Sequence, residues 1–268
     1  MRLTYFQSGL RKNFWLVVCV WLACGTAYGT DDLNDLLSRA SKRTAAFLDQ
    51  FSNVKCTEKV AQEKLRQDGK VEKDAESTYD YLVILSNSGG ELSLNESRLA
   101  LHEAKPDKQK TSLLVSNGFA TLFLVFHPYY SESFQFTALG DDLLNGQAMR
   151  KVAFKHIPGT HSPAALSLRG REYPLELSGT AWIDPQSGSI ARIVATIGNS
   201  MGDVGLKTMD SEVDFAPVPF RDMQKTYWFP AKAVVEVETP RQHWRNTHVF
   251  SDYKQFSVST DEKVASNK

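Results

Sequence analysis

The sequence predicts an α+β protein, in which a curved antiparallel sheet of about ten strands carries an N-terminal amphipathic helix and a second buried helix on its concave face. Near the start of the chain, apolar residues recur with the 3.6-residue period of a helix, and from residue 54 onward most follow the two-residue period of strands. The strand-like segments show no βαβ alternation, which indicates an antiparallel sheet with its helices gathered on one side. Several of these strands have one apolar and one polar face, as a sheet wrapped around a core or cavity would have.

Residues 1–29 have the pattern of a secretory signal peptide. Arg2, Arg11 and Lys12 give a positive start, residues 14–23 are an apolar run, and residues 25–29 are a small-residue exit. The run is shorter than the about 20 residues that a membrane-spanning helix needs. We therefore expect a periplasmic or secreted protein, cut after residue 29.

Two alternatives for this leader remain open. The leader could stay in place as a membrane anchor. The sequence Trp21-Leu22-Ala23-Cys24 also loosely resembles a lipobox, in which a lipidated Cys24 would tether the protein to a membrane. The expected organisation is a signal peptide over 1–29, a single domain over 30–260 and a polar tail over 261–268.

Charge and cysteine content limit the classes of partner and of stabilisation. The chain has 31 basic and 31 acidic residues, and the leader holds three of the basic ones and none of the acids, so the net charge without the leader is −3. Without a basic excess we expect no nucleic-acid partner. Cys56 is the single cysteine after the leader, so no internal disulfide is possible. Its phase with Val54 and Val60 predicts a buried strand position.

The first predicted element is an amphipathic helix that ends near Asn53. Asp31 and Asp32 are suitable N-caps. The apolar positions recur every three or four residues and form one stripe, which must be buried against another element: Leu33, Leu36, Leu37, Ala40, Phe47, Leu48 and Phe51.

Strands and turns follow. We expect strands at 54–65, 79–85 and 92–102, and a charged loop at 105–110. The apolar residues 113–126 contain a short buried helix at Asn117–His127, ended by Pro128. A buried strand is the alternative for that run.

The rest of the chain reads as strand and turn, with a long surface loop at Pro158–Tyr173. Asn145-Gly146 predicts a tight hairpin turn between 134–139 and 148–157. The clearest hairpin joins 175–184 to 189–197 through Pro185-Gln186-Ser187-Gly188. Further strands are expected at 204–215, 226–229, 231–239 and 247–258.

The catalytic and metal-binding motifs are weak. Gly198-Asn199-Ser200-Met201-Gly202 matches the G-x-S-x-G nucleophile elbow, but that motif needs a helix directly after the serine and a parallel sheet. A glycine-rich hairpin turn is the simpler interpretation, and a secreted serine hydrolase using Ser200, with His243 or His248, is the minor alternative. His-Glu at 102–103 lacks the second histidine of a zinc motif, because Pro106 stands in its place. We expect no catalytic residue, no metal and no cofactor.

The hairpin over residues 177–193 carries a family resemblance. Its sequence, LSGTAWIDPQSGSIARI, resembles the W-I-D hairpin of LolA-like periplasmic proteins, which sort or carry lipoproteins. Four other segments are similar to parts of that family: the helix before the first strand, the turn Asn145-Gly146-Gln147, the segment Tyr227-Trp228-Phe229-Pro230, and residues 250–254. The resemblance implies an open half-barrel with an apolar cavity between sheet and helices, in carriers or sensors for lipid or lipoprotein.

On this basis we expect a non-catalytic protein that binds a hydrophobic ligand, a lipid or a lipoprotein acyl chain. If there is a cavity, the candidate lining residues are Phe123, Phe126, Phe134, Trp182 and Trp228. Trp182 stands out because it lies on the polar face of its strand. The alternative is an envelope structural or protein-interaction module, which binds another envelope protein and whose core is filled by its own side chains.

Overall fold

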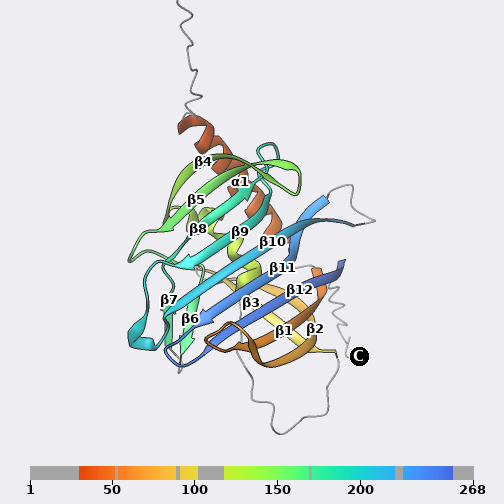
Figure 1. Ribbon diagram of the computed structural model, residues 1–268. Coiled ribbons are helices and arrows are strands. Elements are labelled where there is room, and N and C mark those ends of the chain that lie inside the picture. Colours follow the sequence, from red (N-terminus) through yellow and green to blue (C-terminus); the bar gives the residue numbers. More distant parts are fainter. Residues whose placement is uncertain are drawn as a thin grey trace, which may run out of the picture.

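A computed structural model describes residues 30–51, 54–88, 91–101, 118–168, 171–220 and 226–255. The predicted leader, Cys24, the charged loop at 105–110 and the polar tail lie outside these ranges. Within them the chain forms a ten-stranded antiparallel sheet with helical segments against one face, which confirms the predicted α+β half-barrel (Figure 1).

The sheet runs in the order β3-β2-β1-β12-β11-β10-β9-β8-β5-β4, and β6 and β7 form a separate two-stranded hairpin. The pairing of β1 with β12 joins the first and the last strand of the described chain, with Val60 opposite His248. The strands are β1 (Val54–Leu65), β2 (Val71–Ser88), β3 (Glu91–Ala100), β4 (Phe134–Leu144), β5 (Gln147–His156), β6 (Ala165–Leu168), β7 (Arg171–Pro174), β8 (Leu177–Ile183), β9 (Ile190–Ile197), β10 (Thr208–Pro219), β11 (Thr226–Glu238) and β12 (His243–Gln255).

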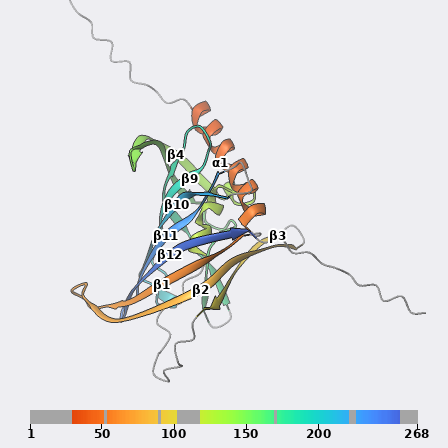
Figure 2. The same ribbon diagram turned by 90° about the vertical axis from the view of Figure 1, so that its right-hand side faces the viewer.

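The predicted amphipathic helix is α1 (Thr30–Phe51), and it lies on the concave face of the sheet (Figure 2). Its apolar stripe is buried as expected, at Leu36, Ala40, Phe47, Leu48 and Phe51. The inward residues of the strands supply the other half of the core, because side chains alternate between the two faces of a strand. Cys56 is among them, as its phase predicts.

The second predicted helix is present, but its form differs from the prediction. Residues Phe119–Phe126 form a 3₁₀ helix, η1, and Pro128–Ser131 form a separate short helix, α2. The first helix ends before Pro128, as predicted, with His127 in an extended conformation, but Pro128 also begins a second helix that the sequence analysis did not expect. A proline fits the first turn because its missing N–H would have no helical partner there. His127 caps α2, as its Nδ1 accepts from the amide of Tyr129 at 3.1 Å.

Two further expectations are corrected. The segment Pro158–Tyr173 is not all loop, because it contains β6 and the first part of β7, whose four-residue strands are too short to show a period. β11 is continuous, whereas the sequence suggested two strands separated at Pro230. Pro230 lies beside a bulge in the β10–β11 ladder, where the missing amide hydrogen is tolerated. The turn Asn145-Gly146 has positive φ at both residues, as predicted.

A buried ionic cluster crosses the sheet beside this apolar core. The Glu58 side chain is fully buried, and its carboxylate accepts from Arg98 Nε at 2.5 Å and Nη2 at 2.9 Å. It also lies 2.8 Å from His248 Nδ1. Arg98 covers the ring of Tyr81, so β1, β2, β3 and β12 all contribute. Burial opposes ionisation of Glu58, but the hydrogen bonds from His248 and Arg98 outweigh it, and its pKa is lowered.

We predict that Glu58→Gln lowers the free energy of unfolding at pH 7 by about 3–5 kcal/mol, because it removes the buried carboxylate that binds Arg98 through two hydrogen bonds and leaves Arg98 with Glu96 as its remaining acid partner among the described residues. Since the folded-state pKa of Glu58 lies below its usual value, its contribution is present at neutral pH and lost as the pH falls through the acid range. The free energy of unfolding of the variant should therefore fall less steeply than that of the unmodified protein as the pH is lowered. Urea unfolding at several pH values measures both effects.

Glu63→Gln is the matched control, because Glu63 lies on the same strand and pairs with Arg245 at 2.7 Å on the surface. Surface pairs contribute at most about 1 kcal/mol. Equal losses from the two substitutions would contradict the role given to the buried cluster.

Candidate functional site

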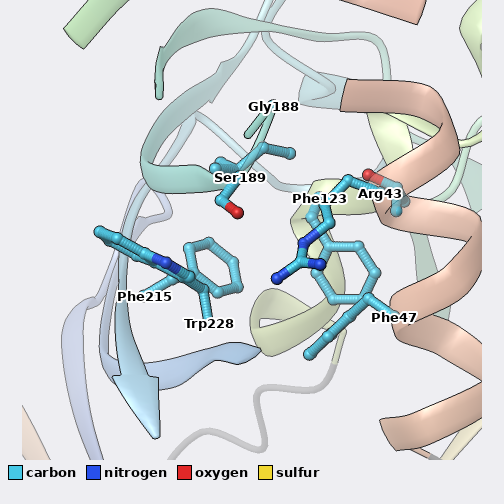
Figure 3. A pocket seen from close by; sticks show the side chains of 9 residues that line it. Arg43, Phe47, Phe123, Gly188, Ser189, Phe215 and Trp228 are labelled. Carbon is cyan, nitrogen blue, oxygen red and sulfur yellow. The ribbon is translucent and has the colours of Figure 1, made fainter. Parts of the chain in front are cut away.

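A pocket lies where α1 meets the sheet, and four parts of the chain line it (Figure 3). We call it the α1 pocket. Side chains come from α1, from η1, from the β8–β9 turn with the first residue of β9, and from the β10–β11 pair. The lining residues are Arg43, Thr44, Phe47, Phe123, Gly188, Ser189, Ile190, Phe215 and Trp228.

Aromatic rings form the inner wall of the α1 pocket. Phe47 of α1 packs edge-on against Phe123 of η1, with ring centroids 4.9 Å apart, and Phe123 meets Phe215 at 6.0 Å. Phe47 also contacts Phe229 at 5.0 Å. Edge-to-face contacts of this kind are favourable beyond the area they bury. The wall is therefore apolar, and it ties both helices to the sheet.

Two polar side chains face this apolar wall. Arg43 donates from Nη2 to the Thr226 carbonyl at 3.0 Å, and its guanidinium lies 5.3 Å from the centre of the Tyr227 ring. Ser189 is 2% exposed, and its hydroxyl has no hydrogen-bond partner among the residues that the structure describes. Figure 3 shows both groups directed into the space between α1 and the aromatic rings.

The β8–β9 turn brings Ser189 to this position because Gly188 lets the helix come close. Gly188 has φ +70°, and a Cβ on it would lie 2.6 Å from the Arg39 carbonyl carbon and 2.8 Å from the Ala40 nitrogen. Asp184 holds the turn, since its Oδ1 accepts from the amides of Gln186 and Ser187 at 3.0 and 2.6 Å. The Asp-Pro-Gln-Ser-Gly sequence thus builds one wall of the pocket.

The α1 pocket is small in this conformation. The space open to the centres of water molecules is about 30 Å³, which is room for about two waters. The aromatic side chains fill the rest of the volume between α1 and the sheet. An acyl chain would therefore need Phe47 or Phe123 to move aside.

The five candidate residues from the sequence fall into three places. Phe123 and Trp228 line the α1 pocket. Phe126 and Phe134 lie in the core near β5, where both rings contact Phe154. Trp182 is half-buried on the other face of its strand, where its indole N–H donates to Asp142 at 3.0 Å and Lys151 lies over its ring.

Sequence reasoning missed Arg43 and Ser189. The expected helix placed Arg43 away from the apolar stripe, and Ser189 appeared only as the start of a strand. The one available signal was the Gly188-Ser189 pair at the end of the turn, which marks a close approach of the backbone.

The Ser200 motif has a structural role in the described chain. A three-residue 3₁₀ turn, Gly202–Val204, follows it instead of a helix long enough for a nucleophile elbow. Ser200 Oγ donates to the Leu206 carbonyl at 3.2 Å. His243 and His248 bind the carboxylates of Glu236 and Glu58. Within the described ranges no group of histidine, cysteine and acidic residues is arranged to hold a metal, and no helix is long and apolar enough to cross a membrane.

No protein-family model and no curated protein sequence matches the chain. Among solved structures, it is similar to a DUF1329 family protein from Desulfovibrio piger, at 10% identity and TM-score 0.44, over 87% of this chain and 96% of that one. It is also similar to a putative outer membrane lipoprotein-sorting protein domain from Vibrio parahaemolyticus, at 12% identity and TM-score 0.33, over 83% of this chain and 95% of that one. A third similar structure is that of the Mycobacterium tuberculosis lipoprotein LppX, at 10% identity and TM-score 0.23, over 85% of this chain and 99% of that one.

We predict that Gly188→Ala destabilises the protein by more than Gly159→Ala. Both glycines have positive φ, so each substitution costs about 1–2 kcal/mol in backbone strain. Gly159 has open space around it, whereas a Cβ at Gly188 would press on the backbone of α1. Chemical unfolding of the two variants measures the difference. Equal losses would mean that α1 does not depend on its close approach to this turn.

Proposed function

We propose that this protein binds the acyl chain of a lipid or lipoprotein between α1 and the concave face of its sheet, without catalysing a reaction on it. The observation that carries the proposal is the α1 pocket, an aromatic-walled space where the helical cover meets the apolar face. Burying an acyl chain there would gain about 0.8 kcal/mol for each CH₂ group. That gain can offset the displacement of side chains that now fill the space.

The way α1 is attached supports such a displacement. Its contacts with the sheet are side-chain packing and surface polar contacts, such as Arg43 to Thr226 and Asp32 to Arg150 at 3.1 Å. The Asp32 side chain is about half exposed, so its ion pair is weak. Moving α1 outward leaves every backbone hydrogen bond of the sheet in place. The strand pairing can therefore persist while α1 moves, and the acyl chain would cover the apolar face that the helix uncovers.

The proposed setting is the bacterial envelope. The leader predicted at residues 1–29 would deliver the protein there, either soluble in the periplasm or tethered through a lipidated Cys24. An acyl chain must be shielded to cross an aqueous compartment, because its exposure to water is unfavourable. We propose a carrier or a sensor for such a chain, with a lipid, a lipoprotein or another envelope protein as partner.

A second candidate function is a protein-interaction module of the envelope with a filled core. The observation that favours it is the small size of the α1 pocket, which has room for only about two waters. Under this alternative the aromatic wall is ordinary core packing, and no ligand enters.

The test is native mass spectrometry of the protein purified gently from the periplasmic or secreted fraction, followed by lipid extraction. An acyl species that co-purifies and leaves on denaturation would support the proposal. A mass without ligand, together with no uptake of added lipid, would contradict it and favour the interaction module.

We predict that Phe47→Ala increases uptake of an acyl probe, because it removes the ring that fills the α1 pocket. The substitution should also lower the free energy of unfolding by about 3–5 kcal/mol. Binding of a fluorescent acyl probe and urea unfolding measure the two effects.

Phe250→Ala is the control, because Phe250 has the same 7% exposure but packs against Tyr81 and His248 away from the pocket. It should lose stability without gaining uptake. Equal gains in uptake would indicate general loosening and would contradict a specific site under α1.

A further inference from the structure

The polar groups of the α1 pocket point to the chemistry of its ligand. Arg43 and Arg39 lie one turn apart on α1; Arg43 lines the pocket with Gly188 and Ser189, and the Arg39 backbone lies beside Gly188. Arg39 Nε is buried without a hydrogen-bond partner among the described residues. Arg43 has a carbonyl and an aromatic ring as its contacts. Asp184 in the adjoining turn uses its Oδ1 to accept from the amides of Gln186 and Ser187. No acidic side chain is among the lining residues, so the charge of Arg43 has no counter-charge within the pocket as the described residues form it.

The hydroxyl of Ser189 is the second observation. A buried hydroxyl without a partner costs about 1–3 kcal/mol, so such groups are uncommon unless something fills the site. Ser189 Oγ points into the same space as the Arg43 guanidinium (Figure 3). It can donate its hydrogen, and Arg43 has further N–H donors besides the one bound to Thr226. The site thus offers several donors and one positive charge beside an apolar wall.

We infer that the α1 pocket recognises the anionic head of a single-chain amphiphile, whose carboxylate or phosphate oxygens are bound by Arg43 and Ser189. This inference rests on the proposed function and names the class of its ligand. A guanidinium binds planar or tetrahedral oxyanions through two parallel hydrogen bonds, which suits both head groups. The hydrocarbon tail passes between Phe47 and Phe123 once these rings move apart.

The test compares amphiphiles that share a twelve-carbon tail and differ in the head group. Dodecanoate, dodecyl phosphate, dodecanol and dodecyltrimethylammonium are titrated into the protein by calorimetry, with acetate and inorganic phosphate as tail-free anions. We expect the two anionic amphiphiles to bind at least about tenfold more tightly than dodecanol, because a hydrogen bond to a charged group contributes that much to affinity. The cationic amphiphile should bind more weakly than dodecanol. Acetate and phosphate should bind far more weakly than either anionic amphiphile.

Variants then assign the preference to residues. Arg43→Gln should remove the advantage of the anionic head while leaving dodecanol binding in place. Lys42→Gln is the matched control, since it removes the same charge from the adjacent, exposed position of α1. Ser189→Ala should weaken dodecanoate binding without lowering the stability of the free protein, because it removes an unpaired buried hydroxyl.

The outcomes separate this inference from the proposed function. Equal binding of dodecanol and dodecanoate would overturn the head-group recognition and leave acyl binding intact. Tight binding of acetate or inorganic phosphate would overturn the need for a tail. Binding of none of the amphiphiles would overturn both. The comparison among head groups uses the unmodified protein, so it decides the question even if a variant fails to fold.

Discussion

The rest of the structure depends on one constraint, which is that a long curved sheet has an apolar concave face that must be covered. The strands pair through their backbones, but this pairing does nothing for the inward side chains, which need partners from elsewhere. Here α1 and η1 supply them, and the contact of Phe47 with Phe123 joins the two covering segments to each other. Because α1 meets the sheet through side-chain packing and the close approach of the β8–β9 turn, and shares no strand ladder with it, the cover is a separate layer (Figure 2). The side-chain packing of α1 on the concave face therefore explains both why the core is tightly packed and why we propose that the helix can be displaced.

The covering layer also explains local features that look unrelated in the sequence. Gly188 is needed because the β8–β9 turn touches the backbone of α1, where any side chain would clash. Asp184 shapes that turn by accepting two backbone amides, so the W-I-D hairpin ends in a fixed platform under the helix. At the other end of the cover, Gly118 donates its amide to Glu96 at 2.7 Å, which fixes the start of η1 on β3. The helices are thus held at defined points, and the α1 pocket lies between them.

The sequence predicts most of this fold, and the parts it misses have physical reasons. The stripe of Leu36, Ala40 and Phe47 and the alternation along β8 and β11 are periodic signals, and Asn145-Gly146 is a strong turn signal. The 3₁₀ form of η1 could not be predicted, since seven of its eight residues are apolar and such a run has no readable period. The four-residue strands β6 and β7 are equally short. For the site, two of the five candidates line the pocket because they are large and apolar, whereas Arg43 and Ser189 are polar and gain their meaning only from the elements packed around them.

The buried polar groups around Glu58 and those of the α1 pocket differ in how fully they are paired. The fully paired set suits a role in stability, and the incompletely paired set suits ligand recognition. Glu58 is surrounded by Arg98 and His248, so every oxygen has a donor and the cluster needs nothing from outside. An incoming ligand would have to break these contacts. Ser189 lacks a hydrogen-bond partner among the described residues, and Arg43 is held by a carbonyl and a ring. A protein gains no stability by leaving such donors unpaired against an apolar wall. Their presence is best explained by an acceptor that arrives with the ligand.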